Sequence, residues 1–445
     1  MVLEDLEDLM KTVAQGCRHY RAAPSRGTPA ARLHALSGHV NARRQAGTPS
    51  ASCYTCTRAC HAAAEADVAV ESDTDYYPRA AAARIAGQEA AFTVPLSFFD
   101  YDSWDKTTKP ASFNMTVPPE LEEEAAKHMG ARRTHVVETD IYDGRPHAPA
   151  LTLDNSGVCM QYAPTAMKGE DFYEIEKVHS VYFDECIEYV KKMTGATKVL
   201  PFDHSVRNKL RAGQDGIGGY ASGAHNDNTL SSGPNRARQL LKPGPHVDEV
   251  LSHRFAVMNV WRRWDGGNDS PLGICTGDSL HPHNEDMQPS DLVYQNRTGE
   301  IYSAIQNPNQ TFFFFSDMEK DEAIILKIYD SLAAGFTPPS DATGPVPRAR
   351  WTLHTSFDNP IESIDDGTAP GPRESCEVRC LVLWAPEELA ELAELRGVTG
   401  LTGGDTFYDP ETKSYKPMSA DGQSAVMREG YEGSRDDVYA KFRKV

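Results

Sequence analysis

A short polar segment of the sequence holds residues suited to metal chemistry. His225, Asn226 and Asp227 form a His-x-Asp triplet within GGYASGAHNDNT, and His354 lies far downstream in the strand-like run WTLHTSF. Two imidazoles and one carboxylate on one face of a metal are the ligands of non-haem Fe(II) oxygenases, and they leave positions open for a cosubstrate and dioxygen. Side chains two residues apart point to the same side of an extended segment. We therefore expect His225, Asp227 and His354 to share one Fe(II) ion.

Two other histidine clusters compete with this assignment. His246-Val247-Asp248 follows Pro-Gly-Pro and leads into a run typical of a helix start, where Asp favours the helix dipole. We interpret His246 as structural. His281 and His283 lie near two aspartates and are another candidate metal cluster, but their proline-rich, acidic context favours a solvated loop.

Two arginines further along the chain could bind an anionic cosubstrate. The distal carboxylate of 2-oxoglutarate needs a fixed cation, and Arg suits this because its planar fork binds carboxylates in a bidentate manner. Arg373 and Ser375 form a sensible carboxylate clamp; alternatively, Arg373 only opens a strand and pairs with a surface acid. Arg379 lies inside an apolar run and needs a partner. It either pairs with Glu377 on the same face or is itself the clamp.

The elements that must position these residues are mostly short strands. Val, Phe and Trp are frequent in the strand-like runs, and Gly, Pro and Asn separate them. Helical spacing predicts helices over 171–193 and 319–332, and Pro386 marks the start of another. Strands with long loops and few helices predict an α+β fold with a mainly β core, a sandwich or jelly roll with flanking helices. The predicted strands cover residues 135–138, 198–202, 255–261, 292–294, 312–315, 351–357 and 376–384.

Composition and charge narrow the class of protein. The chain has 445 residues and a formal net charge of −19, from 45 Lys and Arg against 64 Asp and Glu. This acidity argues against nucleic acid as a partner, and no run approaches the ~20 apolar residues that span a bilayer. Its 9 cysteines do not describe a disulfide-stapled secreted scaffold. We therefore expect an intracellular, cytoplasmic enzyme with a small-molecule substrate; the sequence does not set its oligomeric state.

The N-terminal part differs from the rest of the chain. Residues 9–64 are rich in Arg and Ser and lack acids, which is typical of organelle transit peptides, although the opening MVLEDLEDLM is unusually acidic for one. We expect residues 1–90 to form a long irregular arm. Alternatively, residues 1–64 direct import into a plastid or another organelle. Residues 91–396 would form the jelly-roll oxygenase domain with helical insertions, and 397–445 a C-terminal extension.

Two further motifs are less convincing. Cys53, Cys56 and Cys60, followed by His61, could hold zinc or an iron–sulfur cluster, but no second pair of ligands follows at a suitable distance. The glycine cluster at 216–219 lacks a clean strand before it and a helix after it, so it is a poor nucleotide-binding loop. Its weakness also argues against a methyltransferase.

Six motifs follow one another in a specific order: HNDNTLSSG (225–233), NVWR (259–262), Pro-Leu-Gly followed by Asp (271–278), NPNQTFFFFSDM (307–318), TLHTSFDNP (352–360) and PRESCEVRCLVLW (372–384). This order resembles the AsaB/CmcJ/NvfI family of mostly fungal and microbial hydroxylases and desaturases. The resemblance covers about residues 130–390. It implies a double-stranded β-helix (jelly-roll) core and Fe(II)/2-oxoglutarate-dependent oxidation of a small organic substrate with O2.

The resemblance also implies roles for individual residues. His225, Asp227 and His354 would be the iron ligands, and Arg373 with Ser375 would hold 2-oxoglutarate.

The same resemblance implies that Asn259, Trp261 and Arg262 line or brace the pocket. The sequence departs from the family in its N-terminal residues and at Arg263-Trp264, where proline commonly follows NVWR. The alternative is a catalytically inactive jelly-roll protein that acts as a binding or interaction partner.

Overall fold

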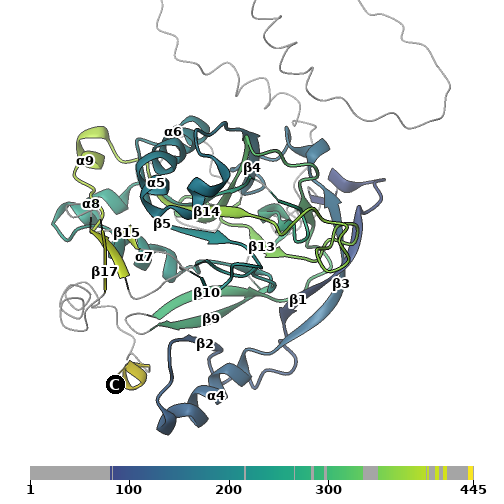
Figure 1. Cartoon of the computed structure of the whole chain (residues 1–445). Helices are drawn as coiled ribbons and strands as arrows, with labels where there is room; N and C mark the ends of the chain where they lie inside the picture. The colour runs from purple at the N-terminus through teal and green to yellow at the C-terminus, as the bar shows by residue number, and fades with distance from the viewer. Residues whose placement is uncertain are drawn as a thin grey trace, which may run out of the picture. The chain divides into compact units, whose positions relative to one another are not determined.

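The computed structural model describes residues 81–443, apart from 83, 215–216, 265, 282–284, 295–297, 334–348, 397, 400–405, 410–413 and 418–438. The N-terminal arm, the targeting alternative and the cysteine cluster of the sequence analysis therefore lie almost wholly outside the described residues. Within the described residues, two large sheets form the centre of the fold, and helices lie outside them (Figure 1). None of the helices described is both long and apolar enough to pass through a membrane.

The larger sheet has nine strands in the order β1-β3-β11-β8-β13-β6-β10-β9-β2. It is a mixed sheet, because β11 runs parallel to β3 and β2 runs parallel to β9, whereas the other pairs are antiparallel. In spatial order its strands span Phe92–Phe99, Thr134–Asp143, Phe312–Phe314, Leu272–Cys275, Leu353–Ser356, His225–Asn226, Thr298–Ala304, Met287–Tyr294 and Ala111–Asn114.

The smaller sheet has five antiparallel strands in the order β4-β12-β7-β14-β5. The main hydrophobic core unites its inner face with the larger sheet: Trp261 and Leu326 pack in one cluster with Ile274 and Phe312. Two sheets that share one core form the jelly roll that the sequence predicts, with a mainly β core in an α+β fold. The five strands span Val158–Tyr162, Glu322–Asp330, Phe255–Arg263, Ser375–Leu383 and Lys198–Arg207.

The outer face of the smaller sheet carries a second core under helices. Alternate residues such as Val378 on β14 and Met258 on β7 pack with Tyr182 and Cys186. The helix predicted over 171–193 is confirmed in its main part, and it contains a π-helical turn, η5, before α6. The helical elements are η2 (Pro119–Leu121), α4 (Glu122–Ala131), η3 (Arg145–His147), η4 (Gly169–Tyr173), α5 (Ile175–Lys177), η5 (Val178–Tyr182), α6 (Phe183–Thr194), α7 (Ser232–Leu240), α8 (His246–Ser252), η6 (Gly277–Ser279), α9 (Glu387–Glu391) and η8 (Ala440–Arg443).

The helix predicted over 319–332 is wrong, because this segment forms strand β12. Every residue of EAIILKIYD in β12 is buried, since the strand lies between β4 and β7 and is covered on both faces. A strand buried on both faces reads as a continuous apolar run, and its periodicity does not distinguish it from a buried helix. The β-branched Ile324, Ile325 and Ile328 are the signal that favours the strand.

The other predicted elements are confirmed. All seven predicted strands overlap strands of the two large sheets, and α9 follows Pro386. His246 begins helix α8 with Asp248 in its first turn, as the sequence predicts. A third, three-stranded sheet contains β15 (Val398–Thr399), β16 (Thr406–Asp409) and β17 (Ser414–Pro417).

Candidate metal centre

The two predicted histidine ligands face each other across neighbouring strands. His225 on β6 and His354 on β13 are a register pair, so their side chains lie directly opposite each other. Their ring centroids are 4.4 Å apart. Sheet pairing thus joins two residues that are remote in sequence, because the short strand β6 inserts between β13 and β10.

Asp227 completes a cluster of three potential ligands. Its Oδ1 lies 3.4 Å from Nε2 of His225 and 3.8 Å from Nε2 of His354. One ligand atom from each of these residues lies within 4.8 Å of the others, and this is the only such group of three His, Cys, Asp or Glu among the described residues. His246 and His281 belong to no such group within that part of the chain, and His283 is not described.

The orientation of each donor suits a divalent metal. Nδ1 of His225 is 2.7 Å from the carbonyl oxygen of Gly223, so it donates to that oxygen and leaves the Nε2 lone pair toward the cluster. Burial, together with the His225 ring, lowers the pKa of His354 to about 4. His354 is therefore a neutral imidazole at neutral pH, the form that binds a metal.

The carboxylate of Asp227 is held on one side only. Its Oδ2 accepts hydrogen bonds from Nδ2 of Asn259 at 2.9 Å and from Nε of Arg379 at 3.2 Å. Burial raises the pKa of Asp227, but the Arg379 guanidinium and the His225 ring outweigh this and hold the pKa well below its usual range. Asp227 is therefore ionised, with Oδ1 available to a cation.

Arg379 is surrounded by acids. Besides Asp227, its guanidinium pairs with Glu377 at 2.7 Å and with Asp203 at 3.3 Å. The register of β14 against β5 shifts next to Arg379, leaving Phe202 unpaired in the ladder, and such a bulge re-aims the neighbouring side chain. Three carboxylates engage this one cation, which favours an orienting role for Arg379 over a cosubstrate clamp.

Arg373 lies in a different setting. It is 2% exposed, its guanidinium stacks 4.3 Å from the ring centroid of Tyr220, and one of its η nitrogens donates to the carbonyl of Ser270. No carboxylate of the described residues forms an ion pair with this guanidinium, and burial lowers the pKa of Arg373 to about 10. A buried cation without a directly paired carboxylate is costly, so an anionic ligand would complete the arrangement.

Two buried polar atoms in this region lack a partner. Nε of Arg373 and Oγ of Ser375 form no hydrogen bond within the described part of the chain. Ser375 begins β14 and pairs in register with Arg207 on β5 and with Arg263 on β7. A carboxylate would supply the missing acceptors and charge, so these residues fit the distal end of a dicarboxylate such as 2-oxoglutarate.

The three residues of the NVWR motif do not share one face. Asn259 contacts Asp227, and Trp261 packs in the main core within 5.7 Å of the Arg373 guanidinium. Arg262 points to the opposite side of β7, where it contacts Tyr182 of η5. Arg262 therefore lies away from the Asp227 side of β7, because successive side chains of a strand alternate between its faces, and its expected role in lining or bracing the pocket stays a prediction.

Sequence reasoning missed two charged residues of the site. Asp203 and Arg207 lie on the inner face of β5, close to Arg379 and Arg373 respectively. The signal that could have found them is the alternation of polar residues in the segment FDHSVR, which places Asp203, Ser205 and Arg207 on one face.

Solved structures share this fold. The iron and alpha-ketoglutarate-dependent endoperoxidase NvfI matches with a TM-score of 0.52 and 20% identity over 66% of this chain and 97% of its own. The same enzyme in a different conformation matches with a TM-score of 0.52 and 21% identity over 66% and 99%. At these identities the likeness establishes the jelly-roll fold.

Sequence relatives come from fungi. Hydroxylase/desaturase efuI of Hormonema carpetanum is 27% identical over 56% of this chain and 84% of its own. Alpha-ketoglutarate-dependent dioxygenase tstK of Talaromyces stipitatus is 26% identical over 57% and 88%. Fe(II)/2-oxoglutarate-dependent dioxygenase nvfI of Aspergillus novofumigatus is 28% identical over 54% and 81%.

The fold and these relatives define the class: the protein is an oxidoreductase of the Fe(II)/2-oxoglutarate-dependent dioxygenase superfamily, which uses Fe(II), 2-oxoglutarate and O2. A family model described as an oxidoreductase/YMDC permease-like domain matches residues 96–383, more than half of the chain. The chain belongs to this family, that of the AsaB/CmcJ/NvfI-like hydroxylases and desaturases. The resemblance inferred from the six motifs is thereby confirmed.

Proposed function

We propose that His225, Asp227 and His354 hold Fe(II) and that the enzyme hydroxylates or desaturates a small organic substrate of the secondary-metabolite or pigment type. The observation that carries the proposal is the approach of three ligand atoms to within 4.8 Å of one another. Relatives named as hydroxylase/desaturase support the reaction class.

The cosubstrate is assigned to Arg373 and Ser375. Their unpartnered buried atoms and the absence of a paired carboxylate on Arg373 support a clamp for the distal carboxylate of 2-oxoglutarate. When bound, Fe(II) with 2-oxoglutarate and O2 supplies the oxidising power that removes hydrogen from a substrate carbon.

The chain's own residues orient these groups and limit the access of water to them. Asn259 and Arg379 hold Oδ2 of Asp227, which fixes the other oxygen toward the metal position. The His354 side chain is only 7% exposed, whereas those of His225 and Asp227 are 17% and 20% exposed. We infer that the substrate approaches from this more open side, while the buried side excludes solvent from the reacting atoms.

The test is turnover after anaerobic loading with iron. The protein receives Fe(II) and 2-oxoglutarate without oxygen, and release of succinate and carbon dioxide is measured after O2 is added. We expect release by the wild-type protein and by His135→Ala, which removes an exposed histidine of β3, and loss of release in His225→Ala. Full turnover by His225→Ala would overturn the ligand assignment. A protein that binds no iron would favour the inactive binding protein instead.

The compartment is a separate proposal. We propose that the enzyme acts inside the cell, in the cytoplasm, with import into a plastid or another organelle through residues 1–64 as the alternative. A fluorescent protein fused to residues 1–90 tests this, because a cytosolic signal excludes the alternative and an organellar signal overturns the cytoplasmic assignment.

A further inference from the structure

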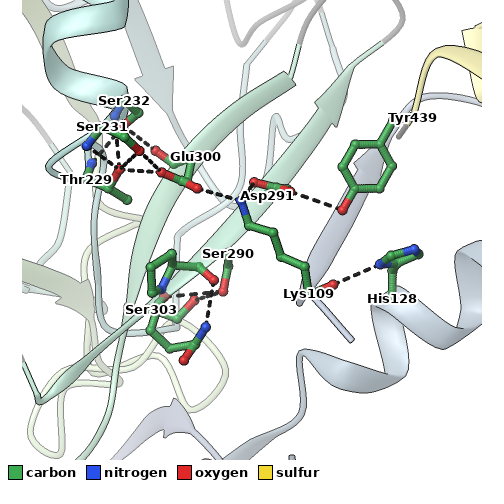
Figure 2. Close-up of polar contacts among 12 residues, drawn as sticks. Lys109, His128, Thr229, Ser231, Ser232, Ser290, Asp291, Glu300, Ser303 and Tyr439 are labelled. Atoms are coloured by element: carbon green, nitrogen blue, oxygen red, sulfur yellow. Dashed lines mark hydrogen bonds and ion pairs between the residues drawn. The ribbon is translucent and has the colours of Figure 1, made fainter. Parts of the chain in front are cut away.

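A network of polar groups, most of them buried or half-buried, joins Glu300 to Lys109, Asp291 and the hydroxyls of residues 229–232 (Figure 2). At its centre is Glu300 on β10, the strand that pairs with β6 through Tyr302 and Asn226. The Glu300 carboxylate accepts hydrogen bonds from Oγ1 of Thr229 and from Oγ of Ser231, each at 2.5 Å. Both hydroxyls belong to the segment that immediately follows Asp227.

The main chain of Glu300 holds the same segment. Its carbonyl oxygen accepts a hydrogen bond of 2.7 Å from Oγ of Ser232, and this hydroxyl oxygen in turn accepts one of 2.7 Å from the backbone N–H of Thr229. On the other side of Asp227, Nδ2 of Asn226 donates to the carbonyl of Ile328 in the smaller sheet at 3.0 Å. The backbone at Asp227 is therefore held between β12 and β10.

Lys109 supports Glu300 from the far side. Its Nζ lies 2.5 Å from Oε2 of Glu300 and 2.6 Å from Oδ1 of Asp291. Asp291 also accepts a hydrogen bond of 3.1 Å from the hydroxyl of Tyr439, near the C-terminus. Burial raises the pKa of Glu300, but the bonds from Lys109, Ser231 and Thr229 outweigh it and lower the pKa to about 2. Glu300 is thus a charged acceptor at neutral pH.

We propose that Glu300 is a positioning residue for the metal centre: it fixes residues 229–232 and thereby the direction in which Asp227 presents Oδ1 between His225 and His354. The inference rests on the proposed function, since it concerns the geometry of that same site. The hydrogen bonds of Glu300 given above go to residues 229–232 and to Lys109, and its effect passes through the backbone of the segment it binds.

The experiment measures metal affinity rather than stability. Co(II), whose visible absorption reports the geometry of its ligands, is titrated into the metal-free full chain well below the unfolding temperature. Outer hydrogen-bond partners of metal ligands typically contribute 10–100-fold to metal affinity. We expect Glu300→Ala to weaken Co(II) binding about tenfold and to change its absorption bands, and Glu300→Gln, which keeps one acceptor, to weaken it less.

Ser231→Ala provides a milder variant, because it removes a single hydrogen bond to Glu300 without leaving a charge unpaired. It should weaken binding in the same direction. Tyr439→Phe is the matched control: it removes one bond from the far end of the network, and Asp291 keeps Lys109 as a partner. We expect wild-type Co(II) affinity and spectrum for this control.

Hydrogen exchange gives a second readout without metal. Amides of residues 227–233 should exchange faster in the Glu300 variants and at the wild-type rate in Tyr439→Phe. If the wild-type protein binds Co(II) and both Glu300 variants bind it with unchanged affinity and spectrum, this inference fails alone. If the wild-type protein binds no Co(II), the proposed function fails, and the inference fails with it.

Discussion

Nε of Arg379 lies 3.2 Å from Oδ2 of Asp227, whereas the other oxygen of that carboxylate, Oδ1, is the one that approaches both imidazoles. This division of the two oxygens would let Asp227 bind a metal through one atom while it accepts hydrogen bonds through the other. The strand β14 thus contributes to the metal centre without supplying a ligand.

Replacing Arg379 by Lys should therefore impair the centre although the positive charge remains. A lysine ammonium is a point charge and cannot contact Asp227, Glu377 and Asp203 in the fixed fork of a guanidinium. We expect a fall of about 10–100-fold in kcat/KM, the usual effect of losing a partner of a metal ligand. Arg238→Lys, in an exposed pair with Asp248, is the control and should leave succinate release unchanged. Equal rates for both variants would contradict the orienting role.

The cosubstrate clamp makes a different kinetic prediction. Ser375→Ala removes one hydrogen bond to a carboxylate, worth about 1.5–3 kcal/mol, so the KM for 2-oxoglutarate should rise at least about tenfold. Arg373→Lys should raise it further, because the bidentate contact is lost. The rate of succinate release is measured against 2-oxoglutarate concentration, with Co(II) affinity as the internal control. An unchanged KM for 2-oxoglutarate in both variants would contradict the assignment of Arg373 and Ser375 as the cosubstrate clamp.

Metal binding should stabilise the fold. A ligand that binds only the native state contributes about 2.7 kcal/mol at a hundredfold excess over its Kd. Thermal unfolding in the presence of Co(II) should therefore occur at a higher temperature than in a chelator. The shift should vanish in His354→Ala and persist in His135→Ala. A shift of equal size in both variants would locate the metal elsewhere.

A pair of histidines on the outer side of the smaller sheet, half-buried His179 and buried His204, predicts acid sensitivity. Nε2 of His179 lies 3.3 Å from Nδ1 of His204, and burial lowers the pKa of His179 to about 4 and that of His204 to about 3. In the unfolded chain both would titrate near ~6.5. Between these pKa values the unfolded state binds more protons than the folded state. The free energy of unfolding that the two neutral imidazoles contribute is therefore fully present above about pH 6.5, and it decreases as the pH falls toward 4.

The urea midpoint at pH 7.5 and at pH 5 measures this dependence. His204→Leu removes one titrating group from an apolar surrounding that includes Phe183, so the difference between the two midpoints should shrink. His135→Ala serves as the control for an exposed histidine. The same difference in the His204→Leu and wild-type proteins would exclude this pair as its source.

Within the NVWR motif, we expect Arg262 to have a structural role and not a catalytic one. Its guanidinium donates to the carbonyls of Ala163 and Lys320 and contacts the Tyr182 hydroxyl. Arg262→Met would leave these acceptors unsatisfied, which should cost roughly 2–4 kcal/mol of folding free energy. Because the side chain lies on the outer face of β7, Co(II) affinity at low temperature should not change. If Arg262→Met weakened Co(II) binding and left the folding free energy unchanged, Arg262 would act at the metal site and not in folding.

The sequence predicted the cluster of His225, Asp227 and His354 because the relevant signals are local or set by alternation. His225 and Asp227 lie two residues apart, and His354 lies in a recognisable strand, so only the pairing of β6 with β13 had to be supplied by the fold. The order of the six motifs is the further signal, since it indicates the family without any knowledge of contacts.

Other features depended on tertiary structure. The sequence of β12 favours a helix because burial on both faces removes the alternation that marks a strand. The contact of Asp203 with Arg379 depends on the pairing of β5 with β14, and the partners of Glu300 come from two segments remote from it in sequence, residues 229–232 and Lys109. Such contacts join residues that no sequence spacing relates.

Side chains alternate between the two faces of β14, so this strand should tolerate few insertions or deletions. Ser375, Glu377 and Arg379 face the centre, while Cys376, Val378 and Cys380 are sealed in the apolar layer behind. Deleting or inserting one residue would exchange the two sets, bringing thiols and methyl groups toward the metal and driving three polar groups into hydrocarbon. Homologous enzymes should therefore vary in the loops that flank this strand, and any new substrate preference should arise there.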